Sequence, residues 1–66
     1  MENHFKENLN KIIKERDIPI KCIAADLGVS LKSVYGWVGD YAGYPKYDTL
    51  IELADYLEVT VDELIR

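Results

Sequence analysis

Few side chains in this sequence of 66 residues have the chemistry that catalysis or metal binding requires. The single histidine, His4, has no second metal ligand nearby in the sequence, and the single cysteine, Cys22, belongs to no Cys–His pair with a plausible arrangement. No Ser–His–acid combination is present either, and no glycine-rich loop could hold a phosphate group. We therefore expect neither an enzyme nor a bound metal or cofactor.

The side chains best suited to binding lie in the segment 30–38. Val34 and Trp37 are three residues apart, so they point to the same side of a helix and are expected to join the core. Trp37 is accordingly interpreted as a core residue and not as a platform on which a base stacks. The outer side of this helix then carries a mixed set of residues: Leu31, Lys32, Ser33, Tyr35 and Gly36.

A tight turn at Gly28 joins this segment to another short helix, and the two helices together must position the outer side chains. In the upstream helix, four apolar or small residues fall on one face: Ile20, Ile23, Ala24 and Leu27. Gly28 ends that helix because a left-handed backbone costs glycine little, and Ser30 begins the next helix as its N-cap. The sequence therefore predicts a helix-turn-helix at about residues 20–38.

The residues of this turn resemble those of the lambda-repressor and Cro-like (XRE-type) helix-turn-helix family. The usual run of small-x-x-Leu-Gly-Val-Ser is present as Ala24, Leu27, Gly28, Val29 and Ser30. The resemblance covers nearly the whole chain and includes Tyr44-Pro45 and the segments 49–54 and 57–64. It implies an all-α, five-helix, lambda-repressor-like DNA-binding domain. We expect residues 1–66 to form this single domain.

The resemblance also implies a function, that of a sequence-specific transcriptional regulator of phage or prophage origin whose residues 30–38 enter the major groove of a double-stranded DNA operator. Leu31 can then meet a thymine methyl group, and Lys32 can donate to O6 or N7 of guanine. Ser33 or Tyr35 can hold phosphates. The complete set of expected DNA-contacting residues is Lys21, Ser30, Leu31, Lys32, Ser33, Tyr35, Gly36, Tyr41 and Lys46.

Three further helices are predicted around the helix-turn-helix. The first follows Asn3 as its N-cap and presents an apolar stripe of Phe5, Leu9, Ile12 and Ile13. The fourth runs from about Tyr47 to Tyr56 and turns five residues inward: Leu50, Ile51, Leu53, Ala54 and Leu57. The last spans Val61 to Arg66 and begins with a capping box formed by Thr60 and Glu63.

A homodimer is expected as well, because a C-terminal helix often supports dimerisation in the family that the sequence resembles. Leu64 and Ile65 are both apolar, and so short a helix is not expected to bury both within one domain. We therefore predict that Leu64, Ile65 and the loop residue Tyr44 belong to a dimer or partner interface.

The net charge of −4 and the pI near 4.7 oppose DNA binding, because small nucleic-acid binders are usually basic. The charge is uneven, since residues 1–46 hold seven Lys or Arg against six Asp or Glu, whereas residues 47–66 hold one against six. A second interpretation is therefore an antirepressor or modulator that binds a basic phage repressor. Its partner would meet either the loop tyrosines or the acidic residues Asp48, Glu52, Asp55, Glu58 and Asp62.

The lone cysteine suits a reducing compartment, and it excludes a disulfide within the chain. No signal peptide and no apolar run of membrane-spanning length are present. The sequence thus predicts a cytoplasmic protein without a membrane partner.

Overall fold

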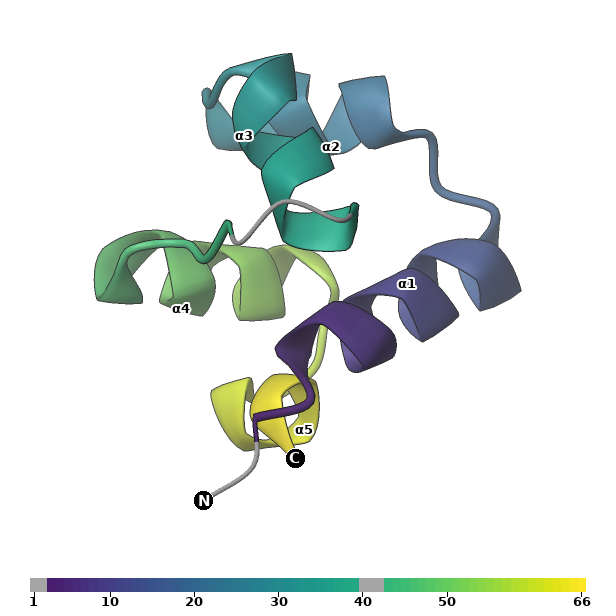
Figure 1. The fold of residues 1–66 in the computed structure, drawn as a ribbon, viewed down its shortest axis with the longest axis vertical. Coiled ribbons are helices and arrows are strands. Elements are labelled where there is room, and N and C mark those ends of the chain that lie inside the picture. The colour runs from purple at the N-terminus through teal and green to yellow at the C-terminus, as the bar shows by residue number, and fades with distance from the viewer. Residues whose placement is uncertain (1–2, 40–42) are drawn as a thin grey trace.

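The computed structural model describes residues 3–39 and 43–66, and within these ranges the chain forms five α-helices (Figure 1). They are α1 (Phe5–Arg16), α2 (Ile20–Leu27), α3 (Leu31–Val38), α4 (Tyr47–Tyr56) and α5 (Val61–Ile65). Helices α2 and α3 lie together at one end of the molecule and α5 lies at the other, with α1 and α4 between them (Figure 1). The predicted all-α fold with five helices is confirmed.

All five helices contribute side chains to one core. Its buried residues are Phe5, Leu9, Ile23, Ala24, Val34, Trp37, Leu50, Leu53, Ala54, Leu57 and Leu64. Trp37 is only 4% exposed, which confirms that this residue belongs to the core. A fully buried Leu or Val side chain contributes about 1.5–3 kcal/mol relative to an exposed one, so these residues fix how the short helices lie against each other.

Two predictions about packing are wrong. Ile51 was expected to face inward, but it is 42% exposed, because one helical step of about 100° turns it away from the stripe that begins at Leu50. Leu64 was expected at an interface, but its side chain is fully buried in the core of the domain. The reason is that α5 packs against α1, where the amide of Asn8 donates to the Leu64 carbonyl at 2.9 Å.

The start of α1 also differs slightly from the prediction. The cap residue is His4 and not Asn3, and the His4 side chain makes no capping hydrogen bond. The Asn3 side chain still satisfies one free amide of the first turn, because its Oδ1 accepts a hydrogen bond from the Phe5 N–H at 2.9 Å. The backbone N–H of His4 donates to the Ile65 carbonyl at 2.8 Å, so the start of α1 lies beside the end of α5.

Polar side chains of α1 tie this helix to the C-terminal ends of other helices. The amide of Asn10 donates to the Val38 carbonyl in the last turn of α3 at 3.0 Å. The guanidinium of Arg16 donates to the Leu57 carbonyl just after α4. Carbonyls at helix ends lack partners within their own helix, so these hydrogen bonds satisfy them and also fix α1 against α3 and α4.

The connection between α2 and α3 has the geometry that the sequence predicts. Gly28 is left-handed, with φ 68°, and the N–H of Val29 donates to the Ala24 carbonyl at 3.0 Å, which makes a Schellman helix end. Ser30 then caps α3, because its Oγ accepts a hydrogen bond from the Ser33 N–H at 3.1 Å. The predicted helix-turn-helix is therefore confirmed in its local hydrogen bonding.

The connection between α4 and α5 repeats this geometry thirty residues later. Glu58 is left-handed, with φ 58°, and the N–H of Val59 donates to the Ala54 carbonyl at 2.9 Å. Thr60 then caps α5 by accepting from the Glu63 N–H at 3.0 Å, while the Glu63 carboxylate accepts from the Thr60 N–H at 3.0 Å. The predicted capping box is confirmed, and residues 3–39 and 43–66 contain two connections in which a left-handed helix end leads to a hydroxyl N-cap.

Candidate nucleic-acid interface

Helix α3 presents a well-supported outer face. Val34 and Trp37 anchor its inner side in the core, and Ser30 fixes its first turn. On the outer side, Leu31 is 42% exposed and Tyr35 is 50% exposed, so both side chains present apolar surface to the solvent. A rigid helix with exposed side chains on one face is suited to insertion into a groove of another macromolecule.

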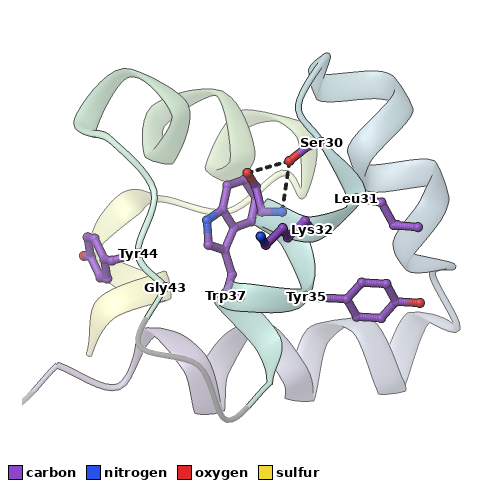
Figure 2. Close-up of a pocket in the computed structure, with 9 residues that line it drawn as sticks. Ser30, Leu31, Lys32, Tyr35, Trp37, Gly43 and Tyr44 are labelled. Carbon is purple, nitrogen blue, oxygen red and sulfur yellow. Dashed lines mark hydrogen bonds between the residues drawn. The ribbon is translucent and has the colours of Figure 1, made fainter.

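The outer face of α3 and the loop that follows it form an open depression (Figure 2). The depression is lined by Ser30, Leu31, Lys32, Ser33, Tyr35, Gly36, Trp37, Gly43 and Tyr44. Six of the nine expected DNA-contacting residues are among them, so the structure brings the predicted α3 residues together in one place.

The other three expected contacts do not line this depression. Lys21 is exposed in the first turn of α2, and Lys46 is exposed just before α4. Tyr41 lies outside the described residues. The α2 N-terminus has no side-chain capping bond, because Pro19 occupies the cap position, so main-chain N–H groups there and Lys21 can both face a phosphate.

Lys32 is the cationic group of the depression. Its side chain is exposed and makes no ion pair with any residue that the structure describes. The six acidic residues of positions 47–66 lie on α4, on α5 or in the turn between them, and none of these six lines the depression. The local charge at α3 is thus compatible with a polyanion even though the chain is acidic overall.

A close contact between two glycines shapes one side of this depression, and sequence reasoning missed it. A Cβ atom added to Gly43 would lie 2.6 Å from the carbonyl carbon of Gly36 and 2.9 Å from its Cα atom, so only glycine fits at position 43. The backbone of the loop therefore lies directly against α3 at Gly36. The glycine content of segment 39–46 was the available signal, but it did not indicate which helix the loop approaches.

Tyr44 was expected at an interface, and the structure places it across the start of α1. Its ring packs against Phe5 with a centroid distance of 5.1 Å and an interplanar angle of 57°. Its hydroxyl accepts a hydrogen bond from the Asn3 amide at 3.1 Å. Tyr44 is exposed and lines the depression. It forms the edge of the depression opposite Leu31 and Tyr35 (Figure 2).

A hydrogen bond from α4 supports α2 from behind. The hydroxyl of Tyr56 donates to the Asp26 carboxylate at 2.8 Å. This hydrogen bond to the carboxylate raises the pKa of the Tyr56 hydroxyl above its ordinary value, and the partial burial of Tyr56 and the negative charge of Asp26 act in the same direction. The bond joins α4 to the helix that precedes the turn and so contributes to the placement of α3.

Two other kinds of site find no support in the part of the chain that the structure describes. Residues 3–39 and 43–66 contain no group of three His, Cys, Asp or Glu side chains that could hold a metal ion. Among the helices of these residues, none is long and apolar enough to cross a membrane.

Comparisons with known proteins agree with this geometry. Residues 8–66 match the family model of the Cro/C1-type helix-turn-helix DNA-binding domain. The fold is similar to the crystal structure of a transcriptional regulator from Listeria innocua, with a TM-score of 0.88 and 31% sequence identity. That match covers 98% of this chain, whereas this chain spans only 60% of the length of the Listeria protein. No curated protein sequence matches the chain.

Proposed function

The chain belongs to the Cro/C1-type helix-turn-helix DNA-binding family, and on this premise we propose that it is a sequence-specific transcriptional regulator whose α3 enters the major groove of a DNA operator. The family is one of DNA-binding domains and not an enzyme class, so no catalytic step is part of the proposal. The observation that carries it is the exposed outer face of α3, where Lys32 lies in one depression with Leu31 and Tyr35, on a helix that Val34 and Trp37 anchor in the core.

The proposed contacts divide into two kinds. Leu31 and Lys32 reach base edges, because they lie in the first turn of α3 on its outer side. Lys21, Lys46 and the main-chain N–H groups at the start of α2 contact phosphates, which fixes the orientation of the domain on the duplex. Contacts of the second kind contribute affinity that is independent of sequence and falls as salt concentration rises.

We propose that the protein binds its operator as a homodimer, since a dimer places two α3 helices in successive major grooves about one helical turn apart. Ile65 and Tyr44 are partly or largely accessible and stay proposed members of the dimer interface, whereas the buried side chain of Leu64 is not available for it. The predicted phage origin and cytoplasmic location stay predictions.

A selection of duplexes from a random pool, followed by fluorescence anisotropy at several salt concentrations, tests the function. The wild-type protein should enrich a common sequence and bind it with a Kd of about 10 nM or tighter near physiological salt. Lys32→Ala should weaken this binding by about 5-fold or more, because a good contact between a side chain and a base edge contributes about 1–3 kcal/mol.

Lys11→Ala is the matched control for this experiment. Lys11 is also an exposed lysine, but it lies beside Val59 and Glu63 on the surface between α1 and α5, away from the outer face of α3. Its substitution should change the Kd by less than about twofold, since a distant exposed charge is largely screened. Equal losses for Lys11→Ala and Lys32→Ala would contradict the placement of α3 in the groove.

The second candidate function is capture of a basic repressor by this protein as an antirepressor. The exposure of Leu31 and Tyr35 favours it, because apolar side chains on a surface helix are also typical of protein interfaces. This candidate predicts that no duplex is enriched at any salt concentration. It also predicts that Lys32→Ala leaves binding of the repressor nearly unchanged.

A further inference from the structure

The outer face of α3 is divided lengthwise into two sides with different chemistry. Leu31 and Tyr35 are one helical turn apart and lie on the same side, away from Gly43 and Tyr44 (Figure 2). Both side chains are about half exposed, so together they form an apolar ridge along the helix. This ridge is an apolar surface that α3 can offer to the floor of a groove.

The opposite side of α3 offers almost nothing to a base edge. Gly36 has no side chain, and the backbone of Gly43 lies against it, so this position is both featureless and partly covered. A residue with a long polar side chain at position 36 would point toward the loop. Direct hydrogen bonding from the second turn of α3 on this side is therefore absent.

The hydroxyl of Ser33 is also engaged within the protein. The Oγ atoms of Ser30 and Ser33 are 2.8 Å apart, and the Ser30 Oγ already accepts from the Ser33 N–H. Because the N-cap hydroxyl of Ser30 and the hydroxyl of Ser33 are hydrogen bonded to each other, they are poorly placed to report the identity of a base. Lys32 is then the one strong hydrogen-bond donor left on the base-facing surface of the first turn.

From these observations, and resting on the proposed DNA binding, we propose that α3 recognises thymine C5-methyl groups with the Leu31–Tyr35 ridge, beside a guanine contacted by Lys32. Thymine is the base that presents a methyl group in the major groove, and apolar side chains recognise it by burying that methyl. A ridge of two residues one turn apart can cover methyl groups of neighbouring base pairs. The target is accordingly a half-site with thymines next to a guanine.

The family resemblance implied a thymine contact for Leu31 and a phosphate contact for Ser33 or Tyr35, and it placed Gly36 among the DNA-contacting residues. The structure changes two of these assignments in the proposal. Tyr35 joins the methyl-binding ridge because it lies beside Leu31, and Gly36 leaves the base-contacting set because Gly43 covers it.

The test uses the duplex that the full chain enriches from a random pool, with each thymine replaced in turn by deoxyuridine. Deoxyuridine keeps every hydrogen-bonding group of thymine and lacks only the methyl. Replacement of a contacted thymine should weaken binding by about fourfold, the value expected for one buried methyl group, and replacement of other thymines should have no effect.

Protein variants then assign the effect to the ridge. Each variant, Leu31→Ala or Tyr35→Ala, should lose discrimination at the thymine that its missing side chain covered. It should bind the duplex with deoxyuridine at that position nearly as tightly as the duplex with thymine there. Tyr35→Phe should keep the discrimination, because the ring and not the hydroxyl covers the methyl. Ile51→Ala is the matched control, since Ile51 has the same exposed fraction as Leu31, 42%, but lies on α4.

The outcomes separate this inference from the proposed function. If the enriched duplex binds equally well with thymine and with deoxyuridine while Lys32→Ala weakens binding, the inference is overturned and the DNA-binding function stands. If each variant, Leu31→Ala and Tyr35→Ala, still discriminates at every thymine that the wild type discriminates, the methyl acts through DNA shape, which also overturns the inference. If no duplex is enriched, the proposed function itself fails.

Discussion

The turns at Gly28 and Glu58 have the same backbone structure, but they carry opposite kinds of surface. Each follows a helix that ends in a Schellman motif, and each leads into a short helix with a hydroxyl N-cap. The fourth residue after each cap, Val34 or Leu64, is fully buried. The same local rules therefore built both helix-turn-helix connections.

The difference lies in the outward residues of the two short helices. Leu31 and Lys32 follow the first cap, whereas Val61 and Asp62 follow the second. Glu63 closes the capping box with its carboxylate and adds a further negative charge near the start of α5. A helix-turn-helix backbone is thus a scaffold, and the side chains on its outer face decide whether it can approach DNA.

The largest expected effect on stability comes from the buried residues on the inner faces of α3 and α5, Val34 and Leu64. Leu64→Ala should lower the free energy of unfolding by about 2–5 kcal/mol, and Val34→Ala by about 2 kcal/mol, because both leave a cavity in a filled core. Urea denaturation followed by circular dichroism measures both values. Ile51→Ala, at an exposed site, should cost less than about 0.5 kcal/mol. A loss below about 1 kcal/mol for Leu64→Ala would show that α5 does not pack as described.

The next prediction concerns the loop that lies against the first short helix. Gly43→Ala should destabilise the fold by about 1–3 kcal/mol, because the new Cβ would lie 2.6–2.9 Å from backbone atoms of Gly36. Gly36→Ala should instead stabilise by about 0.5–1 kcal/mol, since its Cβ meets Gly43 only at 3.6 Å and alanine favours a helix interior. Thermal unfolding of Gly43→Ala and Gly36→Ala tests this prediction. A shift of the melting temperature in the same direction for both variants would contradict the close contact.

A smaller effect is expected from substitutions of the left-handed residues in the two turns. Gly28→Ala should destabilise by about 1 kcal/mol even though nothing lies within 4 Å of the added Cβ, because the cost comes from the left-handed backbone alone. Glu58→Gly should stabilise by about 0.5 kcal/mol, since it relieves the same conformation at φ 58°. A higher denaturant midpoint for Gly28→Ala, or a lower one for Glu58→Gly, would contradict the equivalence of the two turns.

The smallest prediction concerns Asp26 and Tyr56, which occupy equivalent positions before the two turns and hydrogen bond to each other. Because the folded state raises the pKa of Tyr56, the bond stabilises the fold fully below the unfolded-state pKa near 10 and loses this contribution as pH rises through the raised value. Tyr56→Phe should lower the free energy of unfolding by at most about 1 kcal/mol at pH 7, because the pair is partly solvated. The variant should also lose less stability than the wild type as the pH rises into the alkaline range.

Stability measured from pH 7 to pH 11 checks this dependence. Tyr47→Phe is the control, since Tyr47 is highly exposed at the start of α4. An alkaline profile that Tyr56→Phe leaves unchanged would show that the hydrogen bond to Asp26 contributes nothing to the link between α2 and α4.

Local sequence signals were sufficient for most of the fold. Gly28, Ser30 and the pair Thr60 and Glu63 specify their turns through their own backbone and side-chain chemistry, and the structure has each of them in its predicted role. The inward spacing of Val34 and Trp37 likewise required only helical periodicity. These features depend on residues within one or two helical turns of each other.

What the sequence did not reveal depends on contacts between distant segments. The burial of Leu64 follows from the packing of α5 against α1, and the match of Gly43 to Gly36 follows from the course of the loop. The left-handed conformations of Asp17 and Glu58 also carry no glycine signal. The surrounding structure imposes them, because the next residue must return an N–H to the helix end.

Chemical shifts of the backbone amides during titration with the enriched duplex test the central claim most directly. Binding through α3 predicts that the largest changes occur at residues 28–36 and that the equivalent amides at residues 58–66 hardly move. The second turn is an internal reference because it has the same backbone geometry and an acidic surface. Large changes confined to α4 and α5, with α3 unaffected, would contradict the account.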